Sequence, residues 1–190
     1  MDRRVRKTRE ALLSAVIEIA ASGNWPEASI NEICDRADIA RSTFYLHFAD
    51  KSQLTDYALA ALEETIKETK SVDSLEKTGI FTFLLPLIKL AVDPVHSFLF
   101  STDANAHDHH EISDRFRLMI ERLVQHEVTQ AREDYNLNWA HQSFLAGGIH
   151  SFVQSCHNRE QNDGTTETAE DLLACIAPLL KYNIEWKRLG

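Results

Sequence analysis

The sequence predicts an all-α fold, and three observations support this prediction. The chain has 190 residues, of which 44% are hydrophobic and 26% charged, a mixture that suits one or two globular domains with apolar cores. Apolar residues recur at three- and four-residue spacings along most of the chain, and no segment alternates between apolar and polar residues as a half-buried strand does. The longest apolar run, Ile80–Val92, contains Lys89 and is shorter than the roughly 20 residues that span a bilayer.

The first two helices are marked by their ends. A helix is predicted over residues 5–22, where apolar positions follow helical spacing as far as the break Gly23–Pro26. A short second helix is predicted over Ile30–Arg36, because Ser29 and Glu32 form the capping-box pattern that satisfies free backbone N–H groups at a helix start.

A turn at Asp38, a residue that tolerates a left-handed backbone, precedes a third helix predicted over Arg41–Phe48. Its two phenylalanines are one turn apart and are expected to face inward. Asp50, supported by Gln53, is predicted to cap a long helix that runs to about residue 69. Two short helices joined by a tight turn form a helix-turn-helix, whose second helix can lie in the major groove of DNA.

Several further helices are predicted beyond residue 54 from apolar periodicity, separated by polar segments. Their ranges are Leu75–Leu90, Phe98–Phe100, Ile112–Ala131, Trp139–Cys156 and Leu172–Trp186. The polar stretch Asn158–Thr166 is predicted to be a loop.

The charges are distributed unevenly along these elements. The net charge is −9, from 20 Lys and Arg residues and 29 Asp and Glu residues. Residues 1–54 carry eight of each sign and are neutral, so the whole deficit lies in residues 55–190, which carry 12 basic and 21 acidic residues. Five of the eight basic residues stand within the first ten positions. A basic end on an acidic body is typical of a protein that contacts an anion, although a solvated terminus has the same composition.

The residues around the predicted turn match a known pattern. They are Ser29, Ile30, Ile33, Cys34, Ala37–Phe48, Lys51 and Leu54. This pattern closely resembles the N-terminal DNA-binding domain of TetR-like transcriptional regulators, over about residues 5–54. Two positions depart from it: Ala40 stands where a capping Ser is common, and Cys34 where Ala is common. Loss of the cap costs on the order of 1 kcal/mol at the third helix.

The resemblance implies both a fold and a function. Residues 1–54 form a three-helix DNA-binding domain, and residues 55–190 form an all-helical domain for effector binding and dimerisation. The expected function is that of a ligand-released repressor, a homodimer that binds a palindromic double-stranded DNA operator and is controlled by an unknown small molecule. A TetR-like activator that works through a protein partner is an alternative.

Groove contact requires exposed hydrogen-bond donors on the third helix and cations around it. Arg41 is the best candidate for reading a base, because its fork can bond a guanine at two points. Tyr45, His47 and Lys51 are implied by the resemblance to contact phosphates, and the N-terminal cations suit minor-groove or backbone contacts. The full set of predicted DNA-binding residues is Arg3, Arg4, Arg6, Lys7, Ser29, Arg41, Ser42, Thr43, Tyr45, Leu46, His47 and Lys51.

Gly147 and Gly148 lie within an apolar helical pattern, where each glycine weakens the helix by about 1 kcal/mol relative to alanine. This cost suggests that another helix packs closely there. The resembling family pairs its last two long helices with those of a second subunit, and packing within the chain is the alternative. The predicted dimer-interface residues are Phe144, Gly147, Gly148, Phe152, Leu172, Ile176, Leu179 and Leu180.

Aromatic residues spread over the central helices are candidates for an apolar effector pocket, with plain core packing as the alternative. They are Phe81, Phe83, Phe98, Phe100, Phe116 and Trp139.

The segment 107–111, His-Asp-His-His-Glu, combines side chains that can bind zinc. Neighbouring residues point in different directions and no HExxH pattern accompanies them, so a polar loop explains the segment equally well. A metal-responsive regulator that uses His107–His110 therefore stays an alternative, and no metal or other cofactor is predicted.

The chain lacks the sequence patterns of common enzymes and of exported proteins. GxSxG, GxxxxGK[ST] and GxGxxG are absent, so no enzyme activity and no catalytic residue are predicted. Three scattered cysteines form no CxxC pair and suggest a reducing compartment. The first ten residues contain no apolar stretch of the kind that a signal peptide needs. A cytoplasmic protein without membrane attachment is expected.

Overall fold

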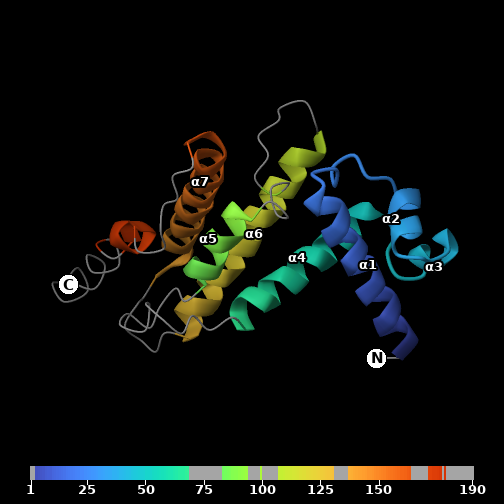
Figure 1. The fold of residues 1–190 in the computed structure, drawn as a ribbon. Helices are drawn as coiled ribbons and strands as arrows, with labels where there is room; N and C mark the ends of the chain where they lie inside the picture. Colours follow the sequence, from blue (N-terminus) through green and yellow to red (C-terminus); the bar gives the residue numbers. More distant parts are fainter. Residues whose placement is uncertain are drawn as a thin grey trace. The chain divides into compact units, whose positions relative to one another are not determined.

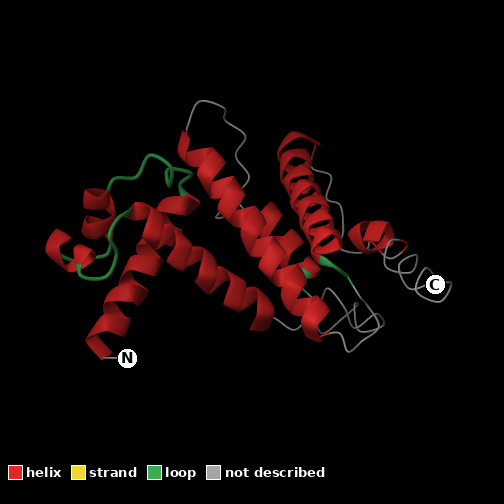
Figure 2. Cartoon of the chain, turned by 180° about the vertical axis from the view of Figure 1, so that it is seen from behind, coloured by secondary structure: helices red, strands yellow, loops and turns green. Residues whose placement is uncertain are grey.

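The structure is a computed structural model that describes residues 3–68, 83–93, 99, 107–130, 137–163, 171–176 and 178. Within these ranges, only the backbone is described for residues 92, 107–110 and 160–163. The described part is helical and contains no β-strand (Figures 1 and 2), which confirms the all-α prediction. The chain forms two compact units, an N-terminal unit of Met1–Leu62 with Asp93–Arg115 and a C-terminal unit of Glu63–Val92 with Phe116–Gly190. A functional boundary at residue 54 stays a prediction.

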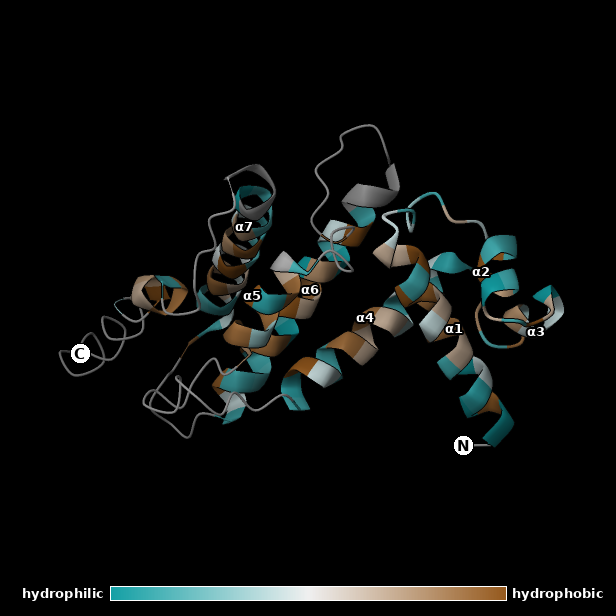
Figure 3. Ribbon diagram, in the orientation of Figure 1, coloured by the Kyte–Doolittle hydropathy of each residue, from teal (hydrophilic) through white to brown (hydrophobic). Residues whose placement is uncertain are grey.

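The N-terminal unit is built around three helices that pack against one another. They are α1 (Arg3–Ala21), α2 (Ile30–Arg36) and α3 (Arg41–Tyr45), followed by the first part of α4 (Lys51–Glu68). Helix α1 buries one stripe at helical spacing, from Leu12 to Ala20, while its first turns are hydrophilic (Figure 3). Ile33 of α2 and Phe44 of α3 are fully buried. The helix-turn-helix therefore has its own apolar core.

Two helices of this unit end in the same way, with a residue in the left-handed conformation. Gly23 follows α1 with φ 74°, and the Asn24 N–H donates to the carbonyl of Ile19. Asp38 follows α2 with φ 52°, and the Ile39 N–H donates to the carbonyl of Cys34 at 3.0 Å. These are Schellman endings, in which the left-handed residue turns the chain so that free carbonyls find donors. The predicted turn at Asp38 is confirmed.

The helix starts also follow the predicted caps. The Ser29 hydroxyl accepts a hydrogen bond from the Glu32 N–H at 3.2 Å and so caps α2. The Asp50 carboxylate accepts from the Gln53 N–H at 2.8 Å, and the Gln53 side chain accepts from the backbone at residue 49. At the start of α3, Ala40 provides no cap, because its methyl side chain has no hydrogen-bond acceptor.

The C-terminal unit contains α5 (Leu84–Val92), the second part of α6 (His107–Gln130) and α7 (Trp139–Asp163), and α5 packs against α7. His157 of α7 is 7% exposed, and its Nδ1 lies 2.8 Å from the carbonyl oxygen of Ala91. That carbonyl belongs to the last turn of α5, where no N–H of the same helix can reach it. His157 thus satisfies the end of a neighbouring helix.

A buried carboxylate is also satisfied within the C-terminal unit. Glu63 is 6% exposed, and its two oxygens lie 2.8 Å from Arg122 Nε and 2.8 Å from Lys67 Nζ. A carboxylate that is removed from water is stable only when its charge is compensated in this way. The pair joins α4 to α6 inside this unit.

The structure differs from the predictions at three element boundaries. Helix α3 ends at Tyr45 instead of Phe48. Helix α6 begins at His107 instead of Ile112, so the segment 107–111, for which a polar loop was the alternative to a metal-binding cluster, is helical. The predicted loop Asn158–Thr166 is helical as far as Asp163. Glu, Gln and Arg are good helix formers, and they extend a helix into solvent beyond the point where its apolar stripe ends. Of the other predicted helices, residues 75–82, 98, 100, 177 and 179–186 lie outside the described residues.

Candidate nucleic-acid interface

Helix α3 presents a short polar surface backed by the core. Phe44 is fully buried on its inner side and Phe48 is 4% exposed, as predicted. Arg41, Ser42, Tyr45 and Leu46 are exposed, and Leu46 reaches 82%. Thr43 and His47 are half-buried. A helix of this kind can enter a major groove, because its side chains reach outward while its backbone is fixed from behind.

Arg41 and Tyr45 contact each other on this surface. Arg41 Nη2 donates a hydrogen bond to the Tyr45 hydroxyl at 3.2 Å, and this bond raises the pKa of Arg41 further above its ordinary value. The two residues are four positions apart on one helix face, and this spacing is the signal from which the contact could have been predicted.

The N-terminal cations lie on the first turns of α1. Arg3, Arg4, Arg6 and Lys7 are exposed, and Arg6 Nε lies 3.5 Å from Glu10 Oε1. Because these residues are helical, they form a charged helix end and not an extended arm. Such an end suits contacts with backbone phosphates better than insertion into a minor groove, which requires a narrow extended chain.

Arg9, the fifth basic residue of this segment, has a structural position. Its guanidinium lies 5.6 Å from the ring centre of Phe48 and 5.4 Å from that of Tyr57. The two rings are themselves in contact, with centres 5.4 Å apart. Arg9 of α1 thus makes cation–π contacts with Phe48, which follows α3, and with Tyr57 of α4. Sequence reasoning missed this role, because it depends on residues about 40 positions away.

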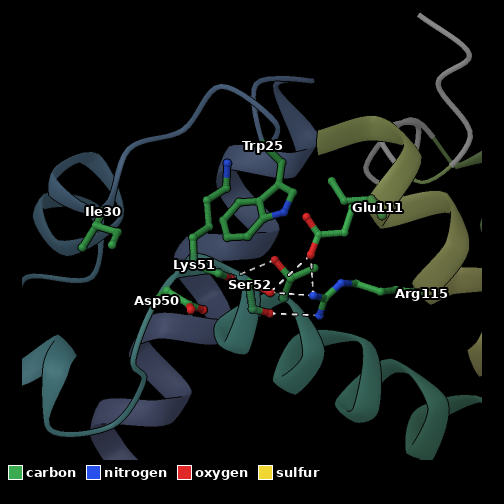
Figure 4. A pocket seen from close by; sticks show the side chains of 9 residues that line it. Trp25, Ile30, Asp50, Lys51, Ser52, Glu111 and Arg115 are labelled. Carbon is green, nitrogen blue, oxygen red and sulfur yellow. Dashed lines mark hydrogen bonds and ion pairs between the residues drawn. The ribbon is translucent and has the colours of Figure 1, made fainter. Parts of the chain in front are cut away.

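Lys51 lies at the first residue of α4 and contacts the loop between α1 and α2. Its Nζ donates to the carbonyl of Pro26 at 2.6 Å and lies 5.2 Å from the ring centre of Trp25, which is fully buried (Figure 4). Lys51 is half-buried as a result. The structure therefore gives Lys51 a role in holding this loop, besides the phosphate contact that the sequence predicts.

A cavity of about 400 Å³ opens next to Lys51, inside the N-terminal unit (Figure 4). Its polar rim is paired within the protein: Arg115 Nη2 donates to Ser52 Oγ and to Glu111 Oε1, each at 2.5 Å, and Arg115 also contacts Asp56. The bond to Asp56 raises the pKa of Arg115. Of the six aromatic residues predicted for an effector pocket, the three that the structure describes, Phe83, Phe116 and Trp139, do not line this cavity.

Three of those six aromatic residues lie within the described part. Phe83 and Phe116 are buried in the C-terminal unit, whereas Trp139, the first residue of α7, is 80% exposed. Phe81, Phe98 and Phe100 lie outside the described residues. Phe83 and Phe116 remain candidates for the effector pocket. Trp139 is too exposed to line a cavity in this structure.

The predicted dimer-interface residues divide in a similar way. On α7, Phe144 is 68% exposed, Gly148 is exposed and Phe152 is half-buried, and these three are spaced four residues apart on one face. Gly147 is half-buried. Leu172 and Ile176 are buried, and Leu179 and Leu180 lie outside the described residues. Among the described residues, this face of α7 is left exposed at Phe144 and Gly148.

Metal binding and thiol chemistry find no support among the described side chains. No group of three or more His, Cys, Asp or Glu residues there is placed to hold a metal ion, and the side chains of His107–His110 are not among those described. Cys34 is buried, and this burial raises the pKa of its thiol, which makes it a poor nucleophile. No helix of the described ranges is both long and apolar enough to cross a membrane.

The chain is similar to known regulators, most clearly at its N-terminal end. The model of the family described as bacterial regulatory proteins, tetR family, matches residues 12–58. The HTH-type transcriptional regulator SrpR of Pseudomonas putida is 23% identical over 145 residues, which cover 70% of this chain and 66% of that protein. The uncharacterized HTH-type transcriptional regulator YxbF of Bacillus subtilis is 40% identical over 55 residues, 28% of this chain and 14% of that protein. The matches thus cover less than two thirds of these relatives.

The fold is shared with solved structures. A TetR transcriptional regulator from Streptococcus agalactiae 2603V superposes with a TM-score of 0.61 and 21% identity, covering 94% of this chain and 96% of that one. The buried core, the capped turn and the exposed face of α3 define a helix-turn-helix motif, whose second helix can enter a major groove. Residues 12–58 thus match the tetR family of bacterial regulatory proteins, and the chain as a whole is similar in fold to a TetR transcriptional regulator.

Proposed function

We propose that this regulator is a homodimer that represses transcription by binding a palindromic operator, and that a small molecule releases it. The observation that carries the proposal is the exposed face of α3, where Arg41 and Tyr45 stand on a helix anchored by the buried Phe44. Arg41 reads one base pair, and residues around it, among them His47 and Lys51, contact phosphates. Ser42, Thr43 and Leu46 complete the surface that faces the groove.

The N-terminal cations extend this interface. Arg3, Arg4 and Lys7 neutralise backbone phosphates from the first turns of α1, as Arg6 does when it leaves Glu10. Ser29 caps α2 and so orients the N-terminal end of that helix, a position at which backbone N–H groups attract phosphate.

The exposure of Phe144 and Gly148 on α7 among the described residues supports the dimer. A Cβ placed on Gly147 or Gly148 would meet no atom of the described residues within 4 Å, so none of those residues explains the two glycines. A second copy of α7 can approach closely there and cover Phe144. Two symmetric reading heads about 34–36 Å apart then fit successive major grooves on one side of a palindromic duplex.

Repression is the simplest consequence of such binding. A protein that occupies an operator overlapping a promoter excludes polymerase without any further contact, whereas activation requires an additional surface for a partner. A small molecule releases the repressor when it binds better to the state in which the two heads do not fit the DNA, and the shift equals this difference in affinity. Phe83 and Phe116 are the described residues proposed to face that ligand.

The proposal is tested by selecting preferred duplexes from a randomised library with the purified protein. Arg41→Ala is expected to reduce discrimination at one base pair of each half-site by about 1–3 kcal/mol, because the bidentate contact is lost. The measurement is a set of fluorescence anisotropy titrations on the selected duplex and on single-base variants of it. Selection of a duplex without two-fold symmetry would contradict the dimer, and unchanged discrimination in Arg41→Ala would contradict the role of Arg41.

Lys51→Ala separates phosphate contact from loop support. A phosphate contact predicts that binding weakens for all sequences alike and that the slope of log K against log salt falls by about 1. Loop support alone predicts lower thermal stability and an unchanged salt slope, since the bond from Lys51 Nζ to Pro26 lies within the protein. Lys89→Ala in α5 is the matched control, because it removes a lysine from the other unit.

A further inference from the structure

The contact between Arg41 and Tyr45 has two components that act together. The hydrogen bond from Arg41 Nη2 to the Tyr45 hydroxyl fixes one edge of the guanidinium, and the guanidinium carbon lies 5.6 Å from the centre of the Tyr45 ring. A cation–π contact fixes where the charge lies, while the hydrogen bond fixes the rotation of the planar fork. Together they restrict the orientation of an arginine that is otherwise exposed to solvent.

Tyr45 can perform this role because its own ring is held from behind. It meets the fully buried Phe44 edge to face, with ring centres 5.4 Å apart and an interplanar angle of 86°. Phe44 in turn contacts Phe48, and Phe48 contacts Tyr57 of α4. This row of aromatic rings runs from the core of the N-terminal unit to the half-exposed ring of Tyr45.

The restriction matters because arginine is a flexible side chain. Ordering a free arginine on DNA costs rotamer entropy, whereas an arginine already held in place loses less on binding. The bond to Tyr45 uses a single N–H of the guanidinium, so the remaining N–H groups are sufficient for a two-point contact with a guanine. The Tyr45 hydroxyl accepts this bond and keeps its own hydrogen for another acceptor.

We propose that Tyr45 is a specificity-determining residue that acts through Arg41: its ring and hydroxyl hold the Arg41 guanidinium in the orientation that reads one base pair. The proposal rests on the base-reading role of Arg41 given above. It differs from a phosphate contact by Tyr45, because a phosphate contact carries no sequence information and weakens binding equally on all duplexes when it is lost.

The test is a double-mutant cycle on the duplex selected by the wild-type protein. Each base pair of a half-site is substituted in turn, and Arg41→Ala identifies the position at which the mismatch penalty disappears. At that position Tyr45→Phe, which keeps the ring and removes the hydroxyl, is expected to lower the discrimination at least threefold and to leave the other positions unchanged. In the Arg41→Ala background, Tyr45→Phe is expected to change discrimination no further, because its route of action is gone.

Tyr57→Phe is the matched control, since it removes a tyrosine hydroxyl from the same aromatic row without touching Arg41. Thermal melts of all variants check that the unit is folded. The proposal would be overturned if Tyr45→Phe kept full discrimination. It would also be overturned if Tyr45→Phe lowered the affinity equally on every duplex and this loss added to that of Arg41→Ala. Either result would leave the role of Arg41 intact. If Arg41→Ala changed the mismatch penalty equally at every base pair, this result would overturn both the role of Tyr45 and the base-reading role of Arg41.

Discussion

The turn between α2 and α3 and the pair formed by α5 and α7 are stabilised by hydrogen bonds of different range. In the first region the partners are close in sequence: Ser29 caps its helix three residues later, and the Ile39 N–H bonds to the carbonyl of Cys34. In the second region His157 bonds to the carbonyl of Ala91, 66 positions away. The same need, satisfaction of free groups at a helix end, is thus met locally in one unit and by a distant helix in the other.

This difference explains why the turn between α2 and α3 can be predicted from the sequence more easily than the packing of α5 against α7. A cap or a Schellman turn has the same residue types at the same spacing wherever it occurs. A contact between two distant helices depends on the whole packing of the unit and leaves no fixed pattern. The family model accordingly matches residues 12–58, the part of the chain in which these local signals lie.

The largest effect is expected at the core of the locally specified region. Phe44→Ala removes a fully buried ring and should lower the free energy of unfolding by about 3–5 kcal/mol. Leu46→Ala, two residues away and 82% exposed, is the control and should stay within about 0.5 kcal/mol of wild type. Denaturant unfolding followed by circular dichroism measures both. Similar losses in the two variants would show that α3 is not anchored by its inner face.

A smaller effect is expected where a distant helix supplies the donor. His157→Leu leaves the buried carbonyl of Ala91 without this hydrogen bond and should cost about 1–3 kcal/mol. His141→Leu, an exposed histidine on the same helix, controls for the change of residue type. The same denaturation experiment applies. Equal stability of the two variants would mean that the end of α5 needs no donor from α7.

The smallest effect, and the one of opposite sign, is expected at the turn. Asp38 adopts φ 52°, which costs a residue with a side chain about 1–2 kcal/mol, so Asp38→Gly should stabilise the protein by about 0.5–1 kcal/mol after the greater freedom of unfolded glycine is subtracted. Asp38→Val, which cannot adopt this conformation without strain, should destabilise it. Thermal melts compare the three proteins, and a lower melting temperature for Asp38→Gly would contradict the predicted strain.

Sequence reasoning was most accurate for the helix-turn-helix. The bounds of α2, the cap at Ser29, the left-handed Asp38, the inward phenylalanines and the cap at Asp50 are all confirmed. It was less accurate where a helix continues without an apolar stripe, as at residues 107–111 and 158–163. In residues 158–163, Arg, Glu and Gln are good helix formers, whereas His and Asp in residues 107–111 are not, so propensity accounts for the first extension only.

The sequence by itself determined where α3 begins, which face it buries and that residues 12–58 match the tetR family of regulatory proteins. Only the tertiary structure decided what several charged residues do: Arg9 packs between Phe48 and Tyr57, Lys51 holds the loop at Pro26, and His157 closes the end of α5. The physical reason is range. Caps and turns form between residues a few positions apart, whereas a charge finds its partner across the packed core, at a place that the order of residues along the chain does not specify.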